Sequence, residues 1–93
     1  MPHTTTNISF EEYLKLKPLS YKTIRMYNKD LPSYLQTYFA IDLYKLRTST
    51  AAKNAFDLVK KHPFFFDFTN KIAHNAYSAG FNHYIRYLRF LEI

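Results

Sequence analysis

With 93 residues, the chain is long enough for one hydrophobic core but too short to hold a separate catalytic domain beside it. It contains no cysteine, which excludes disulfides, thiolate zinc sites and cysteine nucleophiles and fits the cytoplasmic location that we expect. Lys and Arg number 13 against seven Asp and Glu, and the resulting charge of +6 favours an anionic partner such as nucleic acid. No apolar run is long enough to span a bilayer, so we expect no membrane partner.

The first predicted helix follows a local capping pattern. Ser9 and Glu12 have the spacing of a capping box, which predicts a short helix that runs to about Leu16. Pro18 ends this helix because the residue before a proline is pushed out of the helical region. Ser20 is then expected to cap a second helix.

The second predicted helix has two faces. Its apolar residues recur at helical spacing and are expected to face the core: Ile24, Tyr27 and Leu31. Its cations follow the same spacing on another face: Lys22, Arg25 and Lys29. Pro32 predicts a kink or a break at Leu31, with a further turn or two beyond it and a crossover within residues 39–46.

A third helix is expected over residues 51–61. Its alternative N-caps are Thr48, Ser49 and Thr50, and Pro63 ends it. The expected inward positions are Ala55, Phe56 and Val59. The FFFDF segment at residues 64–68 is hydrophobic on every side, so it forms either a short buried helix, which we favour, or an exposed interface.

The last helix is expected to begin at Asn75 or Ser78 and to run nearly to Ile93. Its apolar stripe has helical spacing: Tyr77, Phe81, Tyr84, Ile85, Leu88 and Leu91. No carboxylate occurs between Asp67 and Glu92, so nothing nearby in the sequence neutralises the cations of this helix. Gly80 is the only glycine of the chain, and inside a helix it indicates close packing against a neighbour rather than a ligand.

Two basic helix faces are therefore the strongest functional feature. The candidate DNA-binding residues are Lys22, Arg25, Lys29, Arg86 and Arg89, with Asn82 and His83 beside them. Tyr21, Asn28 and Asn82 are candidate neutral hydrogen-bond donors to phosphate. This hypothesis requires the second and last helices to be neighbours, and the simpler alternative is that both faces are only solvated surface.

No catalytic set can be assembled from these residues. His83 and Arg86 have the H-x-x-R spacing with which tyrosine recombinases bind the scissile phosphate, but only seven residues follow Arg86, so no nucleophilic tyrosine lies well downstream. The four histidines are scattered and form no metal-ligand pattern. We therefore predict a protein that is not an enzyme and that needs neither a cofactor nor a metal.

Three segments resemble known DNA-processing proteins. Residues 19–27 (LSYKTIRMY) are similar to the L-S-x-x-T-I-x-x-Y opening, and residues 77–88 (YSAGFNHYIRYL) to the S-A-L-x-x-Y-x-x-F-L ending, of the N-terminal core-binding domain of tyrosine recombinases and phage integrases. Residues 41–46 (IDLYKL) resemble the S-L-Y-E-I stretch of a similar helical module that precedes some restriction-type endonuclease domains. Pro32, inside the second predicted helix, departs from the usual pattern of these domains. The resemblance implies a SAM-like helical fold that binds DNA and adjoins a C-terminal catalytic domain.

These observations predict an all-α protein, a compact SAM-like bundle of four or five short helices. Residues 1–7 are expected to be a disordered N-terminus, and residues 8–93 a single helical domain. The predicted function is binding of duplex DNA through its phosphates, as the N-terminal part of an integrase-like or restriction-type protein. The alternative is a protein interaction or homodimerisation module that uses an aromatic surface: Phe64, Phe65, Phe66, Phe68 and Phe90.

Overall fold

A computed structural model describes residues 8–63 and 76–92 of the chain. Within these ranges all regular structure is helical and there is no strand, which confirms the predicted all-α bundle. The elements in chain order are α1 (Phe10–Lys15), α2 (Tyr21–Arg25), the π-helical segment η2 (Met26–Asp30), α3 (Leu31–Phe39), the 3₁₀ turn η3 (Leu43–Lys45), α4 (Ser49–Lys61) and α6 (Ala76–Glu92).

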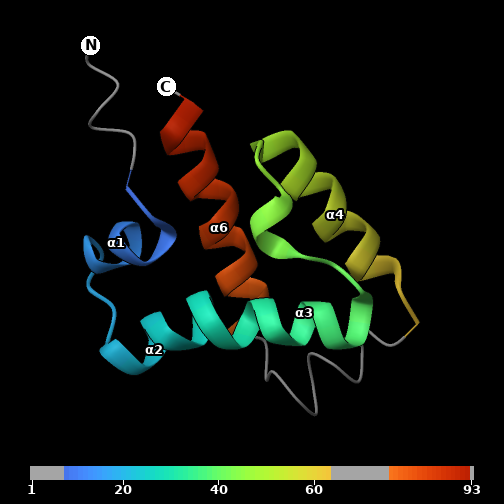
Figure 1. Cartoon of the computed structure of the whole chain (residues 1–93), viewed down its shortest axis with the longest axis horizontal. Coiled ribbons are helices and arrows are strands. Elements are labelled where there is room, and N and C mark those ends of the chain that lie inside the picture. The colour runs from blue at the N-terminus through green and yellow to red at the C-terminus, as the bar shows by residue number, and fades with distance from the viewer. Residues whose placement is uncertain (1–7, 64–75, 93) are drawn as a thin grey trace.

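Helix α6 lies at the centre of the arrangement. The elements α2, η2 and α3 follow one another along one edge of the molecule, and α6 rises from them between α1 and α4 (Figure 1). It packs against α1, η2, α3 and α4. The buried side chains of its predicted apolar stripe are Phe81, Tyr84, Ile85 and Leu88. Leu91 is partly buried and packs against the same core, so the stripe is confirmed where its side chains are described.

The helices begin where local hydrogen bonds cap them. The Ser9 hydroxyl accepts a hydrogen bond from the Glu12 amide at 3.1 Å, and the Glu12 carboxylate accepts one from the Ser9 amide at 2.8 Å, which confirms the capping box. Ser20 and Thr48 cap α2 and α4 by accepting from backbone amides in their first turns. Because Thr48 is the cap, α4 starts slightly earlier than predicted, and it ends just before Pro63 as expected.

The helical path does not break at Pro32. Instead η2 is a π-helical turn, in which the amide of Leu31 donates to the carbonyl of Met26, and α3 follows directly with Pro32 in its first turn. Proline has no amide hydrogen, so a regular α-helix would leave the carbonyl of Asn28 without a donor. The Tyr44 hydroxyl donates to that carbonyl at 2.8 Å. The predicted interruption at Leu31 is therefore a local change of helical winding.

The core is built from the predicted inward positions. Those of α2, η2, α3 and α4 that are buried are Ile24, Tyr27, Leu31, Phe56 and Val59. Ala55 is only partly buried, and Ala52 is the fully buried alanine of α4. Between α4 and α6 the rings of Phe56 and Phe81 stack with their centroids 4.6 Å apart. This stacked pair joins the two helices that border the site described below.

Gly80 marks a very close helix contact. A methyl group on its Cα would lie 2.7 Å from Cδ1 of Tyr27 and 3.2 Å from Cδ2 of Leu31. Favourable carbon–carbon contacts lie at about 3.5–4.0 Å, so only a residue without a side chain fits here undisturbed. The prediction that Gly80 serves close packing is confirmed.

Tyrosine hydroxyls tie α6 to distant parts of the chain. Tyr84 donates a hydrogen bond to the carbonyl of Leu46 at 2.8 Å, and Tyr87 donates one to the carbonyl of Ile8 at 2.6 Å. Burial raises the pKa of Tyr84 to about 12, and the neighbouring Tyr87 adds to the effect. Both tyrosines are therefore neutral donors that fasten the crossover and the N-terminal segment to α6.

Several predictions concern residues beyond those described. The disordered N-terminus at 1–7 and the aromatic segment at 64–68 lie outside the described ranges. Asn75 also lies outside them, whereas Ser78 lies within α6 and so does not begin that helix. In the part of the chain that is described, no helix has both the length and the apolar character needed to cross a bilayer.

Candidate nucleic-acid interface

Helices α4 and α6 border a groove of about 270 Å³. Its lining residues are Lys53, Phe56, Asp57 and Lys60 from α4 and Asn82, Ile85, Arg86 and Arg89 from α6. Phe56 and Ile85 are buried, so they form its apolar floor. The rim carries four cations and one carboxylate, which makes the groove a strongly positive surface.

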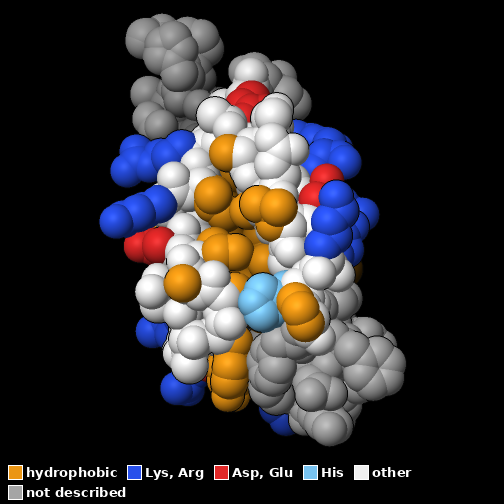
Figure 2. All heavy atoms as spheres, turned by 90° about the vertical axis from the view of Figure 1, so that its right-hand side faces the viewer, with side chains coloured by type: hydrophobic (Ala, Val, Ile, Leu, Met, Phe, Trp, Pro, Cys, Tyr) orange, Lys and Arg blue, Asp and Glu red, His pale blue; other side chains and the backbone are white. Residues whose placement is uncertain are grey.

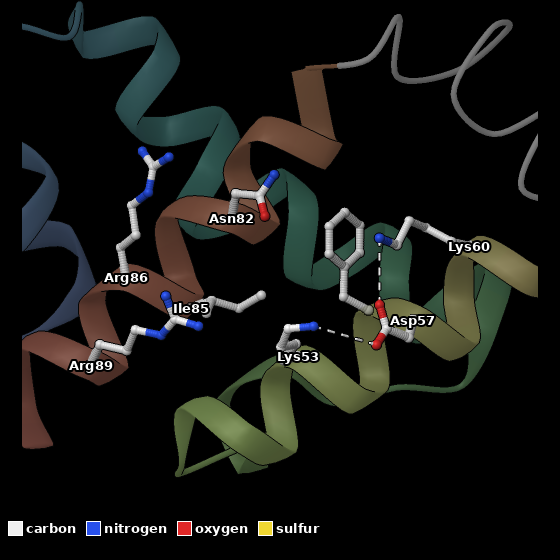
Figure 3. A pocket seen from close by; sticks show the side chains of 8 residues that line it. Lys53, Asp57, Lys60, Asn82, Ile85, Arg86 and Arg89 are labelled. Carbon is white, nitrogen blue, oxygen red and sulfur yellow. Dashed lines mark ion pairs between the residues drawn. The ribbon is translucent and has the colours of Figure 1, made fainter.

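Asp57 lies between the two lysines of the α4 rim. One of its carboxylate oxygens is 3.4 Å from Nζ of Lys60, and the other is 3.9 Å from Nζ of Lys53 (Figure 3). Nζ of Lys60 also lies 4.6 Å from the centroid of the Phe56 ring, a cation–π contact. Lys53, Phe56, Asp57 and Lys60 have helical spacing, so all four lie on one face of α4. This face of one helix therefore positions both ammonium groups.

The α6 rim supplies two arginines and an amide. Arg89 extends across the groove toward α4, while Arg86 points away from Arg89 (Figure 3). Both are exposed, and no carboxylate among the described residues forms an ion pair with either of them. Asn82 projects from the preceding turn into the space between the helices (Figure 3). These arginines are the least neutralised charges of the groove.

One end of α6 is tied to the start of α4. The Glu92 carboxylate accepts hydrogen bonds from both the amide and the hydroxyl of Ser49, each at 2.7 Å. These two bonds hold the pKa of Glu92 below its usual range, and Arg89 contributes further. The tie joins the last turn of one groove helix to the first turn of the other.

The structure divides the predicted DNA-binding residues into two sets. Those in the groove are Asn82, Arg86 and Arg89. Those on α2 and η2 are exposed but do not line the groove: Lys22, Arg25 and Lys29. Because η2 packs against α6, the two basic helices are neighbours, as the hypothesis requires.

Sequence reasoning missed Lys53 and Lys60. They lie two helical turns apart on α4 with Asp57 between them, a spacing that places all three on one polar face. That spacing is visible in the sequence. Nothing in it, however, indicates that this face of α4 adjoins the arginines of α6.

His83 is held against the core rather than in the groove. Its ring stacks on Tyr27 with the centroids 5.3 Å apart, and its Nδ1 is buried without a hydrogen-bond partner among the described residues. Burial lowers the pKa of His83, and the positive charges of Arg86 and Lys17 lower it further. The ring is therefore neutral at pH 7, so it adds no positive charge to the basic surface.

The two other neutral candidates differ in access. Asn28 is only 8% exposed and its Oδ1 has no partner among the described residues, so the prediction that it donates to phosphate is wrong. This residue lies in the π-helical turn. Tyr21 is 73% exposed and remains accessible to a ligand.

Two hollows that share Ile41 and Leu58 lie on another side of α4. Their apolar lining residues are Phe39, Ala40, Ile41, Leu46, Ala55, Leu58 and Val59, and polar side chains line part of each. Leu58 is 68% exposed. Hydrophobic side chains form a strip on this face, with Lys and Arg on both sides of it (Figure 2). We call this surface the Leu58 strip.

Within the described ranges, no three His, Asp or Glu residues lie close enough together to hold a metal ion. Comparisons of the chain with models of protein families, with curated proteins and with solved structures find no match. The likeness to core-binding domains thus depends on short sequence motifs alone.

Proposed function

We propose that this protein is a DNA-binding module that contacts the phosphates of duplex DNA, with the α4–α6 groove as its main contact surface. The observation that carries the proposal is the convergence of Lys53, Lys60, Arg86 and Arg89 on one open groove with a single carboxylate. Lys and Arg supply most of the phosphate contacts in protein–DNA complexes.

The chemistry of the rim suits a phosphodiester backbone. An arginine can donate two parallel hydrogen bonds to a phosphate, and the lysines act as more flexible point charges. Asn82 adds a neutral donor in the same groove. Lys22, Arg25 and Lys29 would extend the contact to a second stretch of backbone. Such contacts fix the position of the duplex but do not distinguish base sequence.

The sequence motifs support the same proposal and extend it. If the resemblance to recombinase and restriction-type modules holds, the groove grips DNA next to a catalytic domain carried elsewhere in a larger protein. The module itself then performs no reaction. Its contribution is affinity and placement on the duplex.

The direct test is fluorescence anisotropy of a labelled duplex of arbitrary sequence. Counterion release predicts that three phosphate contacts weaken binding roughly 40-fold between about 50 and 200 mM salt. Reversing both groove arginines, Arg86→Glu with Arg89→Glu, is expected to weaken binding at least about 10-fold and to reduce the salt slope by about two.

A matched control separates the groove from total charge. Lys45→Glu with Arg47→Glu makes the same charge change at two exposed residues that do not line the groove. This control is expected to lose much less affinity than the groove variant. Equal losses in the two variants would show that only net charge matters and would contradict the groove as the binding site.

The Leu58 strip supports a second candidate function, a protein interaction surface. Of the interface first expected, residues 64–68 lie outside the described ranges and Phe90 is partly buried against the core. Leu58, in contrast, is exposed and lines the apolar surface that is observed. Leu58→Ser should then shift the protein toward monomer in sedimentation velocity at unchanged charge. A monomeric protein before and after the change would count against self-association through this strip.

A further inference from the structure

We infer that Asp57 regulates phosphate binding in the α4–α6 groove: its carboxylate occupies, between Lys53 and Lys60, the position that a backbone phosphate takes in the complex. The inference rests on the proposed function and specifies how the groove is occupied when no DNA is bound. It makes Asp57 an internal competitor of the ligand.

The geometry matches such an exchange. The two oxygens of Asp57 each face one ammonium group, at 3.4 Å from Lys60 and 3.9 Å from Lys53. A phosphodiester also has two non-bridging oxygens that carry its charge, so it can take the same two partners. Arg89 extends toward α4 across the groove, and Arg86 lines the same groove (Figure 3). Neither arginine forms an ion pair with a carboxylate among the described residues.

The exchange also costs little free energy. The side chains of Asp57, Lys53 and Lys60 are 44%, 59% and 47% exposed, and ion pairs between exposed groups contribute little to stability. Water therefore solvates the Asp57 carboxylate once it turns away. Lys60 keeps its contact with the Phe56 ring, so it stays at the groove when its ion pair opens.

Two consequences follow for ligand choice. A small anion that displaces Asp57 gains contacts with the two lysines only. A strand of linked phosphates is also held by Arg86 and Arg89. Asp57 thus favours a polyanion over free inorganic phosphate. Removing its charge should raise affinity for both, and proportionally more for the small anion.

The test compares Asp57→Asn with a matched control, Glu11→Gln. Glu11 forms the same kind of exposed pair with Lys15 at 3.4 Å, and its side chain is 45% exposed, but it does not line the groove. Removing one negative charge close to a bound phosphate is expected to tighten duplex binding about 3- to 10-fold at about 50 mM salt. The control is expected to change affinity less than about two-fold, because its charge is distant and screened.

A second variant distinguishes competition from a structural effect. Adding Lys60→Gln to Asp57→Asn should return the affinity close to that of the unmodified protein, since the gain depends on the lysine that Asp57 had neutralised. Circular dichroism melts of each variant check that the fold is kept. The same series is titrated with inorganic phosphate as a competitor of the labelled duplex.

The outcomes separate the two proposals. If the unmodified protein binds duplex but Asp57→Asn binds no more tightly than Glu11→Gln, Asp57 is not a competitor and this inference fails alone. Weaker binding by Asp57→Asn would instead make Asp57 a residue that positions the lysines, and it also overturns the inference. If none of the proteins binds duplex at about 50 mM salt, the proposed function fails and the inference fails with it.

Discussion

The two sides of α6 are packed in opposite ways. Toward η2, Gly80 brings the helix so near to Tyr27 and Leu31 that no further carbon fits between them. Toward α4, Asn82, Arg86 and Arg89 border an open groove. One helix thus makes its tightest contact on one side and presents its charged, solvent-facing side chains on the other.

The difference follows from the residues between the helices. On the η2 side Gly80 has no side chain, so the side chains of Tyr27 and Leu31 lie directly against the α6 backbone. On the α4 side the stacked rings of Phe56 and Phe81 fill the contact between the two helices, and the long cationic side chains lie beyond it. Changes at Gly80 should therefore alter stability, and changes at the exposed Arg86 and Arg89 should alter binding.

The largest effect on stability is expected from Gly80→Ala. The added methyl group would lie 2.7 Å from the Tyr27 ring, and overpacking of this kind costs about 1–3 kcal/mol, only partly offset by the better helix propensity of alanine. We expect urea unfolding to show a loss of about 2 kcal/mol. DNA affinity of the folded protein should hardly change.

The neighbouring exposed residue provides the control. Ala79→Gly removes a methyl group where nothing is packed tightly, so propensity alone should apply and cost up to about 1 kcal/mol. A Gly80→Ala protein as stable as the unmodified one would show that α6 and η2 can separate without loss. The contrast between the two sides of α6 would then be much weaker.

The second effect is a loss of stability in alkali. Burial raises the pKa of Tyr84 to about 12 from an ordinary value near 10, so folding favours the protonated phenol. Its contribution is fully present below about pH 10 and is lost as the pH rises toward about 12. Thermal melts across this range should show the loss. Tyr84→Phe should make it less steep, and the remainder comes from Tyr44 and Tyr87, whose pKa values burial also raises. An equally steep loss in the variant would exclude Tyr84 as the cause.

The third effect is that of Tyr44→Phe. The change removes the donor to the Asn28 carbonyl and leaves a largely buried acceptor unpaired, at a cost of about 1 kcal/mol in urea unfolding. Tyr21→Phe is the matched control because that side chain is 73% exposed and no hydrogen bond of its hydroxyl is seen among the described residues. Equal stability of the two variants would mean that water replaces the Tyr44 hydroxyl.

The elements that depend on short-range chemistry could be predicted from the sequence. Ser9 with Glu12, and Ser20, act on amides two or three residues away, so their caps are visible in the chain itself. The inward positions of the helices repeat with the helical period and were found in the same way. Gly80 was recognised as a packing residue because a lone glycine inside a helix needs a steric reason.

The features that depend on distant contacts could not be predicted. Tyr44, 16 residues away, donates to the Asn28 carbonyl, which Pro32 cannot do, and Asn28 is buried within the π-helical turn. The groove exists because α4 lies beside α6, which no local pattern specifies. Lys53 and Lys60 were missed for this reason, although each is plainly a surface cation in the sequence.

The smallest expected effect joins the two sides of the comparison. Glu92 lies on α6 beyond the groove and holds Ser49 at the start of α4, and these bonds keep its pKa below the usual value of 4.5. A lowered pKa means that folding favours the carboxylate, so its contribution is present at neutral pH and is lost as the pH falls through and below that value. Glu92→Gln should therefore melt slightly below the unmodified protein at pH 7, and the difference should shrink as the pH approaches about 3. Asp30→Asn, at an exposed residue, should show no such convergence.

If Glu92→Gln also leaves duplex affinity unchanged, the width of the groove is set by the stacked Phe56 and Phe81 rings and not by the tie at its end. If affinity falls instead, the groove on the open side of α6 depends on the hydrogen bonds between Glu92 and Ser49, just as the packed side depends on Gly80.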